Sequence, residues 1–191
     1  MATSVGMASS ALVLIGDNSI SALTEDDAAA NLYTRAYRAF LSEFPWPFAL
    51  KAQRLSRNTA SPDDLLGYDY SFNLPADHIR TLRVSPNNDY RVIGGAVYSN
   101  EEALLLEYVY AADESVLPPH AEEAMIHKLA FEFAKSVTED QSAMDTFYQT
   151  YKDRLQKAMV IESQGAPAIE IQDSPFTNPY YNTDLYANRY K

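Results

Sequence analysis

The histidines are the side chains of this sequence that change charge near neutral pH, and their spacing limits the chemistry they could do. His120 and His127 are seven residues apart, which places them on one face of a helix but two turns from each other. That separation is too long for a shared metal ion, and Glu123 between them is a poor third ligand. His78 follows Asp77 and is expected in a loop. The sequence therefore predicts surface histidines and no metal site.

Other patterns that carry chemistry are also missing. The chain has no cysteine, and so no thiol nucleophile, disulfide or thiolate ligand. Gly94 and Gly95 are expected in a hairpin turn and not before a helix, so they do not form a phosphate-binding loop. Ser10 and the other serines have no recognisable His and Asp partners. We expect no cofactor and no catalytic residues, although an enzyme with a dispersed site remains an alternative.

Helical periodicity occurs in two parts of the chain, before and after a central region of strands. Apolar residues three and four apart predict helices over 5–15, 24–44, 120–137 and 139–164. Ser4 is the expected N-cap of the first helix, and Gly16 is expected just after its end. Thr138 and Gln141 have the spacing of a capping box for the last helix. Lys128 and Glu132 are expected on the solvent side of the third helix.

Between the helices the period changes to two, which is typical of strands. Tyr68, Tyr70 and Phe72 alternate with polar residues, and Leu104, Leu106, Tyr108 and Tyr110 do the same. Shorter strands are expected over 79–84, 90–93 and 96–99, separated by turn residues. The polar stretch 50–62 is expected to be a solvated strand or loop. These segments together predict a small antiparallel sheet.

Trp46, the only tryptophan, lies between Pro45 and Pro47, where the second helix ends and the strands begin. The prolines restrict this step to extended backbone. We expect Trp46 to fill the core where the helices meet the sheet, because large aromatic side chains dominate small cores. An exposed anchor at an interface is the alternative.

The sequence thus predicts an α+β, mainly α fold. Residues 1–45 and 118–164 form a helical bundle, residues 46–117 a β insert, and residues 165–191 an extended C-terminal arm. The net charge of −11 argues against gripping nucleic acid. No stretch has the length of a membrane span or the layout of a secretory signal, so we expect a soluble protein made inside the cell.

The arm is rich in aromatic residues without helical period. Residues 176–190 contain five aromatic residues. A chain end without a core of its own cannot bury such side chains. This composition is typical of a segment that becomes ordered on a partner. The candidate partner-binding residues are Phe176, Tyr180, Tyr181, Tyr186, Arg189 and Tyr190.

The features also occur in a distinctive order. "LIGDNSISAL" follows the first helix, and "FLSEFPWPFAL" ends the second. "YDYSFNLPADHIRTLRV" and "YRVIGGAVYSNEEALLLEYVY" carry the strands, and "LPPHAEEAMIHKLAFEFAKSVTED" forms the third helix. Over roughly residues 5–160 this series resembles the tail tubular protein A family, the head-to-tail adaptors of short-tailed phages and their prophage relatives.

The resemblance implies a structural virion protein that is not an enzyme. Members of that family form a ring, typically of twelve copies, that binds the portal protein on one side and the tail nozzle protein on the other. DNA passes through the lumen without specific binding, and a C-terminal extension can reach the portal. The expected location is the tail or neck of the virion, after synthesis in the host cytoplasm. The alternative reading is a small acidic helical protein that binds another partner.

Overall fold

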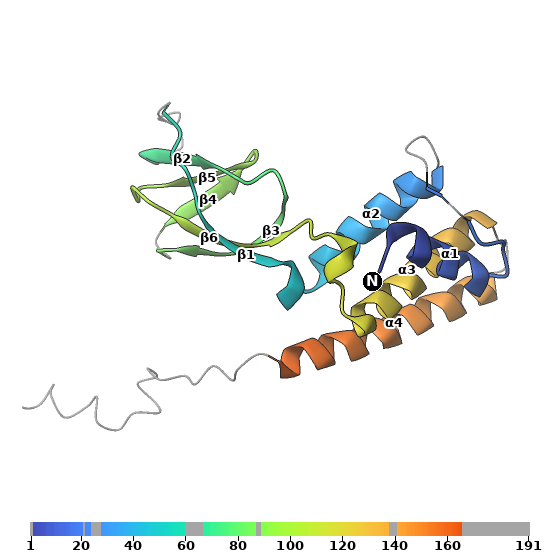
Figure 1. Cartoon of the computed structure of the whole chain (residues 1–191). Helices are drawn as coiled ribbons and strands as arrows, with labels where there is room; N and C mark the ends of the chain where they lie inside the picture. Colours follow the sequence, from blue (N-terminus) through green and yellow to red (C-terminus); the bar gives the residue numbers. More distant parts are fainter. Residues whose placement is uncertain are drawn as a thin grey trace, which may run out of the picture.

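The computed structural model describes residues 2–20, 22–23, 28–59, 67–86, 89–137 and 141–165. The described residues form two lobes, one of helices and one of strands (Figure 1). The expected α+β, mainly α fold is confirmed for them. The predicted C-terminal arm and residues 138–140 of the predicted capping box lie outside the described residues.

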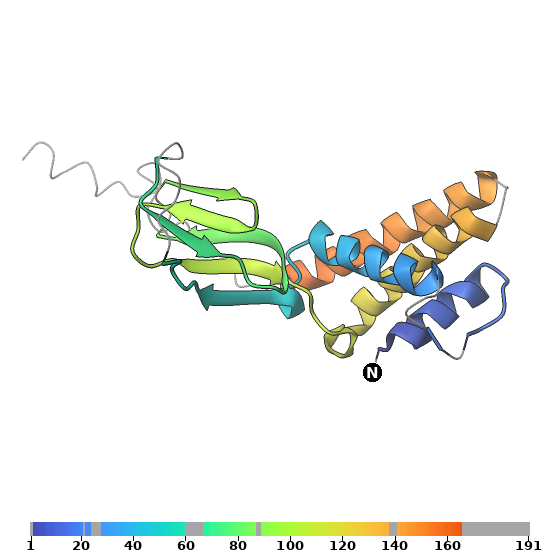
Figure 2. The same ribbon diagram turned by 90° about the horizontal axis from the view of Figure 1, so that it is seen from above.

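The helical lobe is built around α3 (Pro119–Val137). Helices α1 (Ser4–Leu14), α2 (Ala28–Glu43) and α4 (Gln141–Gln164) all pack against it. Figure 2 shows α1 and α4 on opposite sides of α3. The buried residues of α3 are spaced three and four apart, as the sequence predicted: Ala121, Ala124, Met125, Leu129, Ala130, Phe133 and Ala134.

The ends of α1 correct one expectation and confirm another. The N-cap is Thr3 and not Ser4: the Thr3 hydroxyl oxygen accepts a hydrogen bond from the Gly6 N–H at 3.1 Å. At the other end Gly16 has φ +84°, a conformation that glycine adopts without steric cost. The Gly16 N–H donates to the Val13 carbonyl at 3.1 Å, and the Asp17 N–H donates to the Leu12 carbonyl at 3.0 Å. This pair of bonds is a Schellman motif.

The strand lobe contains two three-stranded antiparallel sheets, where the sequence had indicated one. The first has the order β1 (Leu50–Arg54), β6 (Leu105–Tyr110), β3 (His78–Ser85), and the second has the order β2 (Tyr70–Asn73), β5 (Ala96–Ser99), β4 (Tyr90–Ile93). Phe72 and Val97 of the second sheet pack with Val84, Leu106 and Tyr108 of the first. The two sheets pack with one face of each against the other sheet. Residues that alternate with period two therefore lie on these inner faces.

Trp46 joins the two lobes and is fully buried, as predicted. It lies between α2 and the short 3₁₀ helix η1 (Pro47–Ala49), and its ring packs against Phe40, Phe44 and Phe48 at centroid distances of 4.9, 5.0 and 5.6 Å. Its indole N–H donates a hydrogen bond to the Phe40 carbonyl at 3.1 Å. The return from β6 to α3 passes through a second 3₁₀ helix, η3 (Glu114–Val116). Both connections therefore pack locally instead of forming long free linkers.

Candidate interaction surfaces

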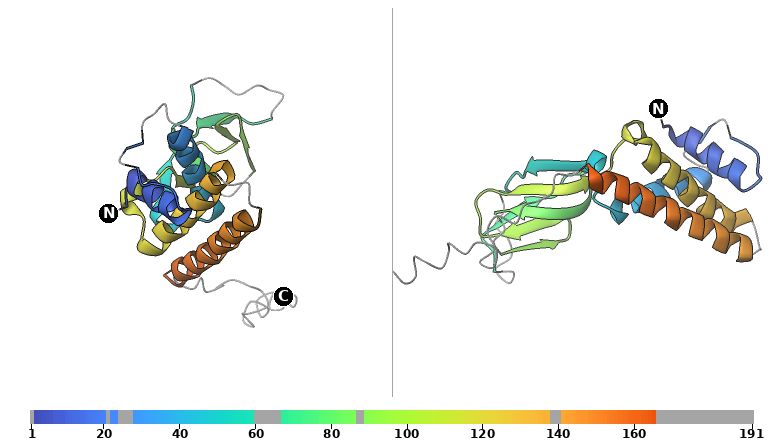
Figure 3. Two further views of the ribbon diagram at one scale, coloured as in Figure 1. Left: turned by 90° about the vertical axis from the view of Figure 1, so that its right-hand side faces the viewer. Right: turned by 90° about the horizontal axis from the view of Figure 1, so that it is seen from below.

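The predicted partner-binding residues Phe176, Tyr180, Tyr181, Tyr186, Arg189 and Tyr190 all lie outside the described residues. What the structure describes is the helix that leads to them. Helix α4 ends at Gln164, on the side of the helical lobe that faces the strand lobe (Figure 3). Any contact made by the arm therefore starts from this end of α4.

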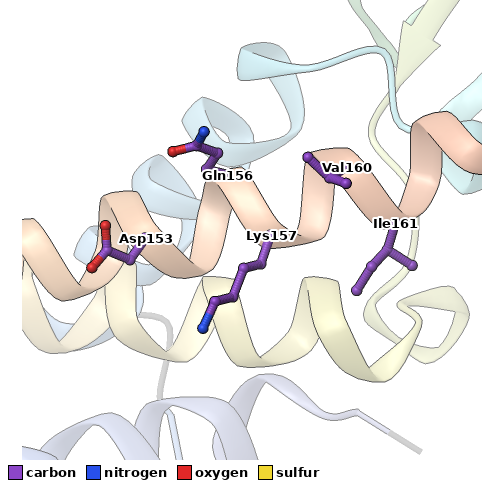
Figure 4. A pocket seen from close by; sticks show the side chains of 5 residues that line it. All are labelled: Asp153, Gln156, Lys157, Val160 and Ile161. Carbon is purple, nitrogen blue, oxygen red and sulfur yellow. The ribbon is translucent and has the colours of Figure 1, made fainter.

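Helix α4 also carries an open hollow on the face turned away from the core. The hollow has a volume of about 480 Å³ and is lined by Asp153, Gln156, Lys157, Val160 and Ile161. Figure 4 shows these side chains projecting from one stretch of the helix. Val160 is 50% exposed and Ile161 is 48% exposed. Two adjacent β-branched residues exposed to this degree on a surface helix point to a contact surface and not to a folded core.

Two further pairs of adjacent large apolar residues are exposed. Val13 and Leu14 lie at the end of α1, with 59% and 46% of their surface accessible, and Val92 and Ile93 lie on β4. β4 is an edge strand of the second sheet, and Gly94 and Gly95 turn the chain directly into β5 with φ +59° and +84°. Exposed apolar residues thus occur at separate places on both lobes, which suits a protein with several contacts.

Inside the helical lobe, Lys128 corrects another expectation. It was expected on the solvent side of α3, but only 6% of its surface is exposed. Its ammonium group donates to a carboxylate oxygen of Glu43 and, at 3.3 Å, to the Tyr151 hydroxyl. The Tyr151 hydroxyl donates to the other Glu43 oxygen. Burial, together with this carboxylate, raises the pKa of Tyr151 well above its usual range, so the phenol stays protonated.

This three-residue cluster ties the end of α2 to α3 and α4, and it forms one side of a hollow of about 490 Å³ that Phe131 and Tyr148 also line. Each member of the cluster already bonds the other two. The arrangement neutralises a buried cation, as a core requires. The sequence did contain a sign that Lys128 is buried, because it lies three residues after Met125 and directly before Leu129, on the apolar stripe.

A second polar cluster lies in the strand lobe, where β3 begins. Lys51 donates to Asp77 at 2.6 Å, and the Tyr108 hydroxyl donates to the other Asp77 oxygen at 3.0 Å. The hydrogen bond from Lys51 is the main reason that the pKa of Asp77 is lowered. Burial and the neighbouring carboxylate raise the pKa of Tyr108 to about 12. Sequence periodicity could not find this cluster, because its members come from three separate segments.

The histidines do not converge. The imidazole of His120 donates a 2.6 Å hydrogen bond from Nε2 to a carboxylate oxygen of Glu162 on α4. His78 stacks on Tyr108 and is not in a loop, since it begins β3. The pKa of His127 is lowered by burial and by Arg154. Within the described residues no group of three or more histidine, aspartate or glutamate side chains could hold a metal ion. His78 and His120 instead make contacts between elements.

Comparison with known proteins adds no relative: no family model matches the chain, and no curated protein matches it. In the part of the chain that the structure describes, none of the helices is long and apolar enough to cross a membrane.

Proposed function

We propose that this protein is a head-to-tail adaptor of a short-tailed phage or prophage, a structural virion protein and not an enzyme. The observation that carries the proposal is the order of sequence features from "LIGDNSISAL" to "LPPHAEEAMIHKLAFEFAKSVTED", which resembles the tail tubular protein A family. The α+β fold, with strands inserted between helices, supports it. The copies form a ring between the portal protein and the tail nozzle protein. In the family that the chain resembles, this ring typically has twelve copies.

The charge of the molecule suits a conduit. A chain of net charge −11 lines a channel with a surface that repels phosphate, so that a duplex slides through and is not held. Passage of DNA then needs no base-specific or phosphate-specific contacts. The site of action is the neck or tail of the virion, reached after synthesis in the host cytoplasm.

The arm at 165–191 is the element that binds the portal or a neighbouring subunit. Tyrosine and phenylalanine bury large areas while immobilising only two side-chain torsions each, so an aromatic-rich segment gains binding energy at low entropic cost. Arg189 and Lys191 add contacts to acidic surface on the partner.

The experiment removes residues 166–191 and measures co-sedimentation with isolated portal rings. The truncated protein should melt within about 2 °C of the full chain, because the deletion leaves both lobes intact, and it should no longer sediment with portal. A matched pair separates the aromatic side chains from the length of the arm. Replacing Tyr180, Tyr181, Tyr186 and Tyr190 by serine should abolish binding, whereas replacing Asn178, Asn182 and Asn188 by serine should preserve it. Undiminished binding by the truncated chain would assign the contact to the lobes instead.

A further inference from the structure

Helix α1 lacks the charged face that a surface helix normally has. The chain carries net charge −11, yet no charged residue occurs between Ala2 and Gly16. Met7, Ala8 and Ala11 face the core, and Val13 and Leu14 face outward with 59% and 46% of their surface exposed. Gly6 and Ser10 are also exposed on the outward side, but this side carries no charge, and its exposed valine and leucine favour a further contact. Among the residues that the structure describes, none buries Val13 and Leu14 fully.

The outer face of α4 carries the hollow described above, which is lined by Val160 and Ile161 together with three polar residues. Val160 and Ile161 form one end of the 480 Å³ hollow, and the exposed Lys157 lies one turn before them (Figure 4). Helix α1 and helix α4 flank α3 on opposite sides in two views (Figures 2 and 3). The projecting residues of α1 therefore cannot reach the hollow of the same chain, but they can reach the hollow of another copy.

The charges at the two surfaces are also complementary. Asp17 follows Leu14 by three residues, while Lys157 precedes Val160 by three residues. If the two helices pack antiparallel with their apolar pairs in contact, Asp17 meets Lys157. Neither side chain has an ion-pair partner among the residues that the structure describes, although the Asp17 carboxylate accepts a bond from the Asn18 N–H at 2.7 Å.

We propose that the outward face of α1 in one copy packs antiparallel on the outer face of α4 in the next copy. Val13 and Leu14 enter the hollow beside Val160 and Ile161, and Asp17 pairs with Lys157. Two different surfaces on opposite sides of one molecule make a heterologous contact, and repetition of such a contact closes a ring when the rotation per copy allows it. This inference rests on the proposed ring, and it names the surfaces that build it.

The absence of cysteine from the chain allows a direct test by disulfide crosslinking. Leu14→Cys and Ile161→Cys are made singly in the full chain, mixed and oxidised, and should give a dimer as the main product. The chain carrying both substitutions should give a ladder of multimers. A mixture of Leu14→Cys with Val116→Cys is the matched control, because Val116 of η3 is also an exposed apolar residue and belongs to neither proposed surface. The control should crosslink at least about tenfold less.

Substitution by aspartate supplies a second readout that needs no disulfide. Leu14→Asp and Ile161→Asp each bury a charge in the proposed contact and should weaken self-association at least about tenfold, as measured by sedimentation velocity. Val116→Asp on η3 should leave association unchanged, because Val116 is exposed but belongs to neither proposed surface. Circular dichroism spectra that match the parent chain confirm that the variants are folded.

The outcomes separate this inference from the proposed function. A ladder from the double-cysteine chain, together with no crosslinking in the control mixture, supports the α1–α4 contact. This holds even if electron micrographs show open chains of subunits and no rings. Rings that form while positions 14 and 161 crosslink no better than the control overturn the α1–α4 contact and leave the adaptor proposal standing. Absence of any ladder at all protein concentrations, with and without portal, also overturns the contact.

Discussion

Trp46 is fully buried and fills the space where the helices give way to the strands. Its ring contacts three phenylalanines, and its only polar atom is hydrogen-bonded to the end of α2. Trp46→Ala should therefore lower the free energy of unfolding by about 3–5 kcal/mol, as other large aromatic deletions in cores do. Chemical denaturation measures this loss. A change near zero would show that the junction contributes nothing to the cooperative unit.

Lys128 gives a second test at a single position. Lys128→Met keeps the length of the side chain but removes the cation that Glu43 and Tyr151 share. The Glu43 side chain is 30% exposed, so water offsets part of the loss, and we expect a cost of about 1–3 kcal/mol. Lys135→Met is the control, because its ion pair with Glu132 is exposed and worth less than about 1 kcal/mol. Equal effects of the two substitutions would contradict the structural role of the buried cluster.

Asp77 makes stability depend on pH. Its pKa is lower in the folded chain than in the unfolded chain, first because Lys51 donates a hydrogen bond to it. The unfolded chain therefore binds the proton more readily, and the stabilisation is present above the ordinary carboxyl pKa of about 3.9 and lost as the pH falls through the lowered value. Because the Asp77 side chain is 35% exposed, the effect is smaller than about 1 kcal/mol.

The measurement for Asp77 is a series of urea unfolding curves between pH 6 and pH 2 for the parent chain and for Asp77→Asn. The variant should be less stable at pH 6, and the difference should shrink toward pH 2. A difference that stays constant over this range would mean that Asp77 acts through packing and not through its charge.

At the scale of elements, Gly16 sets the end of α1 and so the position of Val13 and Leu14. Its φ of +84° is strained for any residue with a Cβ atom, and Gly16→Ala should cost about 1–2 kcal/mol. Ser10→Ala, at an exposed position within the same helix, should change the free energy of unfolding by less than about 0.5 kcal/mol. Thermal unfolding of both variants checks this. If Gly16→Ala is as stable as Ser10→Ala, the Schellman motif is not what ends the helix.

Periodicity in the sequence predicted most of the elements but not how they pair. The apolar stripe of α3 and the alternation in β6 are long enough to show their period, so their type and their buried faces were predicted correctly. The order β1-β6-β3 could not be predicted, because period two tells which face of a strand is buried and not which strand lies beside it. One sheet was therefore expected where two are present.

The errors at single residues have equally local causes. Thr3 and Ser4 are adjacent hydroxyl residues, and either could cap α1, so the sequence alone could not choose between them. Lys128 was placed on the solvent side because lysine is rarely buried, although its spacing put it on the apolar stripe. The outer hollow of α4 could not be predicted from the sequence. In a sequence, exposed apolar residues look the same as core residues, and only the structure shows which of them are left uncovered.

At the scale of the whole molecule, two lobes place contact surfaces in different directions. Helices α1 and α4 present opposite sides of the helical lobe, and β4 presents an apolar edge on the strand lobe (Figures 1 and 2). A ring subunit needs two such sides for its neighbours and further surfaces for the structures above and below it. The shape and the acidic charge of the molecule agree with the adaptor proposal, in which we propose that the arm makes the additional contact.

The most direct measurement of the central claim is negative-stain imaging of the full chain with and without a portal protein of the same phage or prophage. The adaptor proposal predicts ring-shaped particles that sit on one face of the portal ring, with one adaptor copy for each portal subunit and an open lumen. It allows the isolated chain to be a ring or a monomer that assembles only on portal. Portal rings that stay bare when mixed with excess adaptor, together with a chain that forms no ring alone, would contradict it.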